Sequence, residues 1–268
     1  MKSLTKTVAL VSSITAMVQC VTVQAQTTPV SGWGFESGYN PTPWTLTDNG
    51  SGNFIVGGST EPANNTAWRA DFPSITLSVG DSITLSGTLS FTNGLFGNGL
   101  FRWGLLNTLG QGGTLTSPGG SWTGGVADAG YVIFLPSSGN GQLQAHTGDI
   151  WFSGKSGYTV GPIANAGAVL YSTYDFLERV TLTSPTTANI SYDFSNTRVG
   201  GSYSLSGTLS DSGVATTTYD AVGFFVNSYG FSTGYTFSDV AVTYVPEPSS
   251  LALVGGALVA LGVIRRRK

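Results

Sequence analysis

The stretch Ser82-Ile83-Thr84-Leu85-Ser86-Gly87-Thr88-Leu89-Ser90-Phe91 alternates polar and apolar residues along its length. A period of two places its four large apolar side chains, Ile83, Leu85, Leu89 and Phe91, on one face, which is typical of a half-buried β-strand. Ser202–Ser210 repeats nearly the same string. Two strands of similar exposure explain this repeat, and an internal duplication is the alternative.

Glycines stand at equivalent positions of the two strings, Gly87 and Gly207, on the apolar side of each. A glycine at such a position often marks a bulge or a close neighbour. We therefore expect either a β-bulge or a close neighbour at these two points.

Strand signals recur along the whole central region, separated by clusters of Gly, Pro, Asn and Ser. They comprise Leu100–Leu106, with Phe101, Trp103 and Leu105 on one face, then Tyr131–Leu135, Val180–Leu182, Ile190–Phe194, Val222–Val226 and Val240–Tyr244. Tyr131–Leu135 is apolar throughout, as for a strand buried on both faces. Only Thr173–Arg179 is compatible with one or two helical turns. The pattern predicts an all-β, two-sheet β-sandwich of about ten to fourteen strands, of the jelly-roll type.

The central region is acidic. Residues 26–245 contain five Lys or Arg and thirteen Asp or Glu, a net charge of −8. Without a basic patch to neutralise phosphates, nucleic acid and anionic lipid are excluded as expected partners. The 220 residues suffice for one large β-domain with a real core.

The N-terminus has the features of a secretory signal peptide over residues 1–25. Lys2 and Lys6 precede a largely apolar, uncharged run from Thr7 to Val23. Small residues then come before the expected cleavage between Ala25 and Gln26. Cys20, the chain's one cysteine, lies inside this segment without a convincing lipobox before it, so we expect a cysteine-free domain that folds without disulfides.

The C-terminus, residues 246–268, combines three features. Pro246-Glu247-Pro248 holds the chain extended, because proline fixes φ and disfavours helix before and within it. The 16 uncharged residues of Ser249–Ile264 follow, and as a helix they would span about 24 Å, short for a hydrocarbon core of about 30 Å. Four cations, Arg265, Arg266, Arg267 and Lys268, close the chain. This stop-transfer cluster should stay in the cytoplasm and leave the domain on the other side of the membrane.

An ordinary transmembrane anchor is one interpretation of this tail, but the order of the three features resembles the PEP-CTERM sorting signal. The resemblance implies that exosortase, a transpeptidase-like membrane protease, is the partner. It also implies a precursor held in the inner membrane of a Gram-negative bacterium, with a periplasmic domain. The mature form would lie on the cell surface or in the extracellular matrix, where exopolysaccharide is made.

Short stretches at the ends of the central region resemble the first and last strands of carbohydrate-binding jelly rolls. They are Gly34-Phe35-Glu36-Ser37-Gly38 and Phe237-Ser238-Asp239-Val240-Ala241-Val242. The resemblance implies that Glu36 and Asp239 could share a structural calcium ion, the only cofactor that we consider. The middle of the chain, Gly80–Phe91 and Phe101–Leu105, resembles concanavalin-type lectin sandwiches equally well, so the type of jelly roll stays open.

Residues that could carry catalysis are few. His146 is the only histidine, so a His/Cys zinc site is implausible and any Ser-His-Asp triad would have to use it. We expect it in a solvent-facing loop. Asp175 and Glu178 form the closest aromatic-flanked carboxylate pair, the kind that glycosidases need, yet two surface anions are the simpler interpretation.

Two tryptophans lie in polar, glycine-rich surroundings, where an exposed ring can stack on the apolar face of a sugar. These are Trp122 and Trp151, whereas Trp33, Trp68 and Trp103 fit core positions better. The leading hypothesis is a non-catalytic, exported surface or matrix protein associated with exopolysaccharide or biofilm. The alternatives are a carbohydrate-binding module that uses the loop tryptophans and a glycan-active enzyme.

Overall fold

The computed structural model describes residues 24–36, 45–57, 66–91, 100–110, 113–115, 121–123, 127–136, 140–150, 158–163, 173–196, 203–227 and 234–247. Gln26–Tyr244 form one compact unit. The chain ends, residues 1–25 and 245–268, are assigned to a second unit, of which only residues 24–25 and 245–247 are described.

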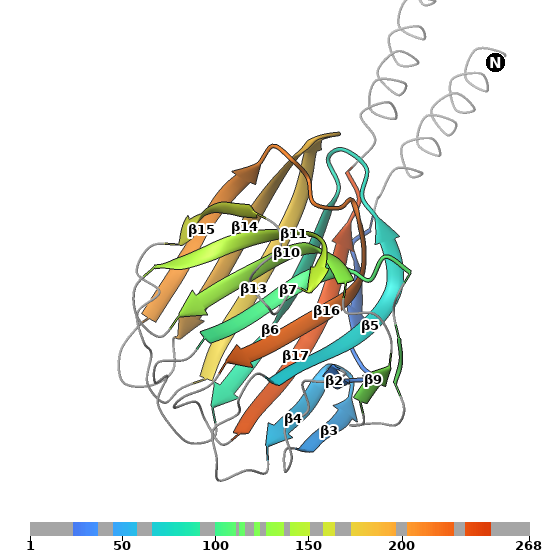
Figure 1. Cartoon of the computed structure of the whole chain (residues 1–268), viewed down its shortest axis with the longest axis vertical. Helices are drawn as coiled ribbons and strands as arrows, with labels where there is room; N and C mark the ends of the chain where they lie inside the picture. Colours follow the sequence, from blue (N-terminus) through green and yellow to red (C-terminus); the bar gives the residue numbers. More distant parts are fainter. Residues whose placement is uncertain are drawn as a thin grey trace, which may run out of the picture. The chain divides into compact units, whose positions relative to one another are not determined.

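Two β-sheets stacked face to face make up the compact unit (Figure 1), which confirms the predicted all-β sandwich. The first sheet has eight strands: β1 (Gln26–Pro29), β3 (Thr45–Gly50), β4 (Asn53–Gly57), β6 (Ser82–Phe91), β13 (Thr173–Ser184), β14 (Thr187–Asn196), β15 (Tyr203–Asp211) and β17 (Gly234–Val245). The second has nine: β2 (Gly34–Glu36), β5 (Thr66–Thr76), β7 (Leu100–Asn107), β8 (Thr114–Leu115), β9 (Ser121–Thr123), β10 (Ala127–Pro136), β11 (Gly141–Ile150), β12 (Tyr158–Ile163) and β16 (Thr218–Asn227).

The described residues thus contain 17 strands, so the expectation of ten to fourteen was too low. The additional strands include β1, β2, β8 and β9, each two to four residues long. Segments this short cannot show a repeated apolar alternation, so the period-two signal does not detect them.

The chain crosses between the sheets repeatedly, as in jelly-roll sandwiches. The eight-stranded sheet has the order β15-β14-β13-β6-β17-β4-β3, with β1 paired to β17 off this path. The other sheet has the order β12-β11-β10-β7-β16-β5-β2-β9-β8. The last strand, β17, therefore lies inside its sheet, between β6 and β4, rather than at an edge.

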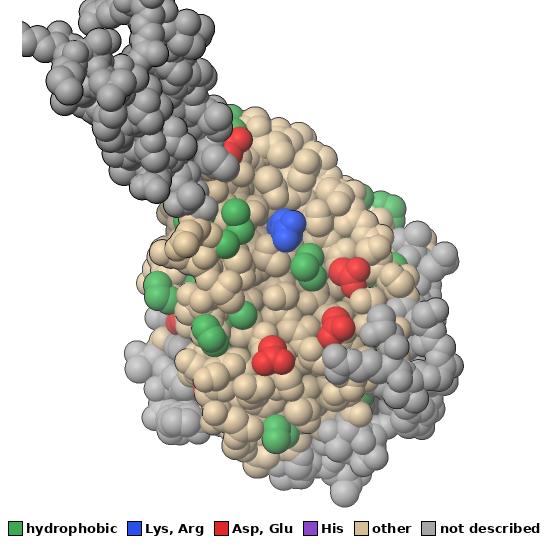
Figure 2. All heavy atoms as spheres, turned by 180° about the vertical axis from the view of Figure 1, so that it is seen from behind, with side chains coloured by type: hydrophobic (Ala, Val, Ile, Leu, Met, Phe, Trp, Pro, Cys, Tyr) green, Lys and Arg blue, Asp and Glu red, His purple; other side chains and the backbone are tan. Residues whose placement is uncertain are grey.

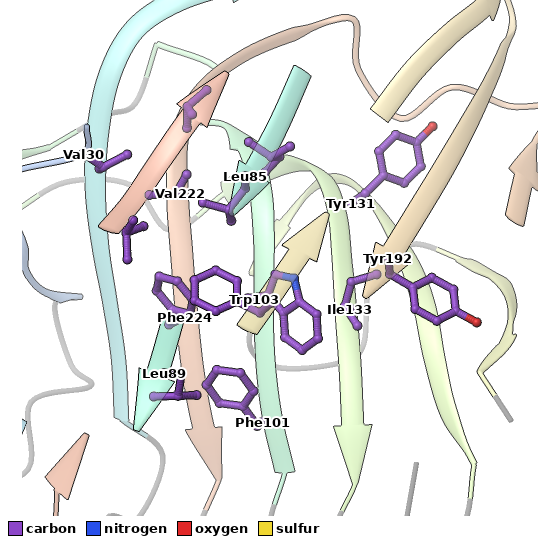
Figure 3. Close-up of a cluster of buried hydrophobic side chains, with 14 of the residues drawn as sticks. Val30, Leu85, Leu89, Phe101, Trp103, Tyr131, Ile133, Tyr192, Val222 and Phe224 are labelled. Atoms are coloured by element: carbon purple, nitrogen blue, oxygen red, sulfur yellow. The ribbon is translucent and has the colours of Figure 1, made fainter. Parts of the chain in front are cut away.

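The core fills the space between the two sheets. Ile83, Leu85 and Leu89 are fully buried, as their alternation predicted, and they meet Phe101, Trp103 and Phe224 from the opposite sheet. Figure 3 shows the labelled side chains of Leu85, Leu89, Phe101, Trp103 and Phe224 converging from both sheets. Trp33, Trp68 and Trp103 are each fully buried, so their assignment to the core is confirmed. Stacked rings, such as Trp33 on Phe54 with centroids 4.1 Å apart, give the core its aromatic character.

Close packing at Gly87 and Gly207 confirms the expectation of near neighbours. A Cβ at Gly87 would lie 2.9 Å from Phe176 Cζ, and one at Gly207 would lie 2.5 Å from the Tyr192 hydroxyl. Both glycines thus make room for an aromatic side chain of the adjacent strand.

The segment Thr173–Arg179 is part of strand β13, so the helical interpretation was wrong. Its side chains alternate between buried and less buried positions along the whole strand. Pairing with β6 on one side and β14 on the other supplies backbone partners that an isolated segment lacks, and this overrides local helix preference.

Candidate functional site

The junction between the β-domain and the C-terminal tail is the first candidate site. Strand β17 ends at Val245, and Pro246 and Glu247 follow without any intervening linker. The Glu247 side chain is exposed. Pro248, the apolar run Ser249–Ile264 and the basic cluster Arg265–Lys268 lie outside the described residues.

The first strand of the domain pairs with the segment that precedes this junction. Strand β1 runs antiparallel to β17, with Gln26 opposite Tyr244 and Pro29 opposite Ala241. The Thr27 and Thr243 hydroxyl oxygens are 2.9 Å apart across the pair. Gln26 is the residue expected to follow signal-peptide cleavage. The two expected processing points thus flank a single pair of neighbouring strands.

Strand β17 changes its pairing partner at Asp239. Residues 234–237 pair with β4, whereas residues 241–244 pair with β1. Asp239 has a φ of +56°, an uncommon conformation for a residue other than glycine. The next residue is held firmly, because the Val240 N–H donates to Gly52 O at 3.0 Å and its carbonyl accepts from the Val30 N–H at 2.9 Å.

The connection after β1 is anchored in the protein. The Asp48 carboxylate accepts hydrogen bonds from the backbone N–H groups of Gly32 and Trp33. Val30 and Trp33 are buried in the core, whereas all four residues of β1 are exposed. Strand β1 therefore has a fixed base and an exposed tip.

A second group of buried polar residues lies on the outer face of the nine-stranded sheet. The Arg102 guanidinium stands over the Phe134 ring at 4.8 Å and the Phe225 ring at 5.3 Å, and these are its cross-strand neighbours on β10 and β16. Burial lowers the pKa of Arg102 to about 10, so the side chain remains a cation at neutral pH. The geometry is that of a cation held between two aromatic faces.

Arg69 and Asp71 form an ion pair on the same face, with Nε and Oδ1 3.0 Å apart. Burial raises the pKa of Asp71, the Arg69 charge lowers it, and nearby Asp220 raises it. Asp220 in turn accepts hydrogen bonds from the backbone N–H and the hydroxyl of Thr108.

His146 is buried in β11, 1% exposed, so its placement in a solvent-facing loop was wrong. Its neighbour Ala145 faces the core, so the His146 side chain lies on the outer face of the sheet. Gly130 of β10 is its cross-strand neighbour. Asp128 on β10 is equally buried. Within the part of the chain that the structure describes, no three His, Cys, Asp or Glu residues come together as a metal site.

Glu178 is fully buried between the two sheets, so the interpretation of Asp175 and Glu178 as two surface anions was wrong for Glu178. The two residues differ by an odd number of positions on β13, which sends their side chains to opposite faces. Asp175 is exposed and accepts a hydrogen bond from the Thr88 hydroxyl. These two carboxylates cannot flank one glycosidic bond.

Burial raises the pKa of Glu178 well above its ordinary value, and the backbone of Leu105 partly offsets this by hydrogen bonding. Buried tyrosines lie near this carboxyl. Burial raises the pKa of Tyr219, and the charges of Tyr131, Glu178 and Asp211 raise it further. The Tyr131 hydroxyl donates to Asp211 Oδ2 at 2.7 Å.

The outer face of the eight-stranded sheet is rich in hydroxyl groups and poor in charge. Ser204, Ser206, Thr208 and Ser210 line β15, and Ser86, Thr88 and Ser90 line β6. Neighbouring hydroxyls bond across the strands, as Ser191 and Thr208 do at 2.8 Å. Figure 2 shows this side of the molecule, where most side chains are neither apolar nor charged.

Three of the four predicted sugar-binding and calcium residues lie in described strands. Trp122 lies in β9 at the end of the nine-stranded sheet, opposite Glu36 of β2. Trp151 lies outside the described residues. Asp239 is exposed on β17, in the other sheet from Glu36. The first and last strands are neighbours, as the calcium hypothesis assumed, but the first strand is β1 and does not contain Glu36.

Residues 1–23 of the expected signal peptide lie outside the described residues. Within the described ranges, none of the secondary structure is a helix of the length and apolarity that a membrane crossing requires.

Comparison with known proteins identifies the tail. Residues 245–268 match the PEP-CTERM protein-sorting motif, which confirms the resemblance drawn from Pro246-Glu247-Pro248 and the residues that follow. The chain matches no curated protein.

Several solved structures are similar to the chain. The Ca2+/Man-bound exoplasmic/lumenal domain of VIP36 is 12% identical, with 83% of this chain and 89% of that chain covered and a TM-score of 0.44. The endo-1,3-beta-glucanase of Streptomyces sioyaensis is 12% identical, with 82% and 95% covered and a TM-score of 0.43. The metal-free carbohydrate recognition domain of Emp46p is 15% identical, with 75% and 87% covered and a TM-score of 0.41.

Proposed function

We propose that this chain is an exported cell-surface or extracellular-matrix protein of a Gram-negative bacterium, sorted by an exosortase-type membrane protease. The observation that carries the proposal is the PEP-CTERM sorting motif, which begins at the last residue of the β-domain. The basic cluster Arg265–Lys268 would hold the tail's end in the cytoplasm, and the domain would lie beyond the inner membrane until the tail is cut.

The domain is proposed to act without catalysis, in association with exopolysaccharide or biofilm. The candidate catalytic residues that the sequence offered are poorly placed for catalysis. His146 is buried, and Asp175 and Glu178 point to opposite faces of β13. The hydroxyl-rich outer face of the eight-stranded sheet suits surroundings of neutral, hydroxylated polymer, with which it can exchange hydrogen bonds at little desolvation cost.

Replacement of Pro246-Glu247-Pro248 by alanines tests the sorting. The variant should insert in the membrane as the wild type does but accumulate as an uncut precursor. Mass spectrometry of the surface form should find no residues of Ser249–Lys268. Recovery of an intact C-terminus through Lys268 from the wild-type surface protein would mean that the tail is a plain anchor.

Glycan arrays probed with residues 26–245 test whether the domain binds sugars, with Trp122→Ala and Trp151→Ala as the variants that should weaken binding if these rings are the platforms. Assays on a polysaccharide panel test the enzymatic alternative. Turnover by the wild type would refute the non-catalytic proposal.

A further inference from the structure

We propose that strand β1 is a releasable clasp that controls the access of the sorting protease to the tail. The inference rests on the proposed function, because it concerns the processing of the same sorting motif. Its starting point is the pairing of the domain's first strand with the last residues before the motif.

The position of the motif limits how the sorting protease can reach the backbone next to it. Pro246 directly follows Val245, the last residue of β17. The four preceding residues, 241–244, have their backbone paired with β1 on one side, while β6 is the neighbour of β17 on the other. Enzymes that act on peptides bind them as extended segments, often by adding them to a strand edge. Docked β1 occupies that edge immediately before the cleavage region.

The clasp is built to open at its tip. Strand β1 has four residues, all exposed. Removal of the expected signal peptide would leave it at the chain terminus, where a strand this short is marginally held. Its base is firm, since Val30 and Trp33 are buried and Asp48 bonds the backbone of Gly32 and Trp33. Residues 26–29 can therefore leave β17 without disturbing the core.

The left-handed residue Asp239 limits the effect of opening to one half of β17. Residues 234–237 remain paired with β4, and Val240 remains bonded to Gly52. Opening of β1 thus frees one backbone edge of residues 241–244 only. The protease would gain one free backbone edge next to the motif, while β6 stays beside β17 and the domain stays folded.

A disulfide across the clasp tests the proposal, because the domain contains no cysteine of its own. Thr27 and Thr243 are opposite each other and their hydroxyl oxygens are 2.9 Å apart, so cysteines there can form a bond about 2.0 Å long. In the full-length chain with Cys20→Ser, the pair Thr27→Cys and Thr243→Cys should slow the removal of the tail at least tenfold under oxidising conditions. A reductant should restore the wild-type rate. Each single cysteine variant, with Cys20→Ser, is the matched control.

Weakening the clasp tests the opposite direction. Thr27→Gly with Thr28→Gly lowers strand preference and removes the hydroxyl contact, so the tail should be removed faster than in the wild type. Equal processing rates in the disulfide-linked, glycine and wild-type chains would overturn the clasp. If the disulfide does not form, the β1–β17 pairing is wrong and the clasp falls with it.

Failure of the clasp is distinguishable from failure of the proposed sorting. An uncut wild-type tail, or a tail cut equally in the chain with alanines at Pro246-Glu247-Pro248, would overturn the sorting proposal. A wild-type tail that is cut only when the motif is intact, combined with unchanged cutting of the disulfide-linked chain, would overturn the clasp alone.

Discussion

Glu178 shows what one buried carboxyl does to a β-sandwich. It occupies a core position on β13, in line with Tyr174 and Phe176, and it is fully buried. A carboxylate in such a place loses its hydration, so the neutral acid is favoured and its pKa rises. Among the described residues, the titratable groups near it are Tyr192, its cross-strand neighbour, and Tyr219, which in turn lies near Tyr131 and Asp211.

The consequence is a stability that falls as pH rises. In the unfolded chain Glu178 ionises near its ordinary pKa, whereas in the folded protein it keeps its proton to a higher pH. The folded state therefore binds more protons between these two values, and stability is highest below the ordinary pKa and declines above it. Glu178→Gln removes this decline.

We expect Glu178→Gln to match the wild type near pH 4 and to exceed its melting temperature increasingly toward pH 8. Each kcal/mol corresponds to about 2–4 °C in a domain of this size. Thermal unfolding of residues 26–245 across this pH range is the measurement. Asp175→Asn, at an exposed position on the same strand, is the control for the loss of a carboxylate. A parallel decline in Glu178→Gln and the wild type would rule out Glu178 as its source.

Gly104 lies against the backbone of the neighbouring strand, whereas Gly207 lies against a side chain. A Cβ at Gly104 would lie 2.4 Å from the Tyr131 carbonyl oxygen in the neighbouring strand, whereas one at Gly207 would meet the tip of Tyr192. The tyrosine ring can turn aside, but paired backbone cannot. We expect Gly104→Ala to cost about 3 kcal/mol and Gly207→Ala less than about 1 kcal/mol. Urea unfolding checks this, and equal costs would contradict it.

The sequence carried a signal for the burial of Glu178 but not for that of His146. Glu178 has the same parity as Tyr174, Phe176 and Val180, so a strand through this segment would have placed it in the core. The competing helical interpretation hid that pattern. His146 lies among polar residues on the outer face of β11. The alternation of polar and apolar residues along that strand therefore does not indicate that His146 is buried.

At the scale of elements, the long strands follow from alternation and the short ones do not. Strands β13 and β14 bury every second residue along most of their length, and β6 buries Ile83, Leu85 and Leu89 of its alternating set. Strand β1 has no such pattern, and its place depends on a partner more than 200 residues away. The sequence therefore predicts the sandwich, whereas the clasp at the sorting junction requires the long-range register.

The row formed by Phe134, Arg102 and Phe225 crosses three adjacent strands, so it belongs to the sheet rather than to one residue. A desolvated cation between rings contributes about 2 kcal/mol or more. We expect Arg102→Ala to lose at least this much and Arg102→Lys to lose part of it, because lysine keeps the charge but not the planar stack. Chemical unfolding measures both. Arg179→Ala, an exposed arginine bound to Thr84, should change stability by less than about 0.5 kcal/mol.

At the scale of the whole molecule, the acidic central region was foreseeable from composition, but the uneven distribution of its polar groups was not. The outer face of one sheet carries cross-strand hydroxyl pairs, and that of the other carries the ion pair Arg69–Asp71 and the buried Arg102. The strands of the eight-stranded sheet are richer in Ser and Thr than those of the nine-stranded sheet, in which β7 and β10 contain neither. Only the sheet order decides which of these residues become neighbours.

Sheet order also dictates when the domain can fold. Strand β17 is the last of the chain, yet it lies between β6 and β4 and buries Tyr235, Phe237, Val240 and Val242. Without it the eight-stranded sheet would split into a four-stranded and a two-stranded piece with open edges, β1 would lose its partner, and the core would face water. Folding thus waits until the residues next to the sorting motif have emerged.

Two truncations test this dependence. Residues 26–233, which lack β17, should show no cooperative unfolding. Residues 30–245, which lack only β1, should unfold cooperatively within about 2 kcal/mol of residues 26–245, since β1 buries none of its own side chains. Tryptophan fluorescence and circular dichroism in urea follow both, with and without reductant, which should have no effect on this cysteine-free domain. Cooperative unfolding of residues 26–233 would show that the sandwich closes before its last strand arrives.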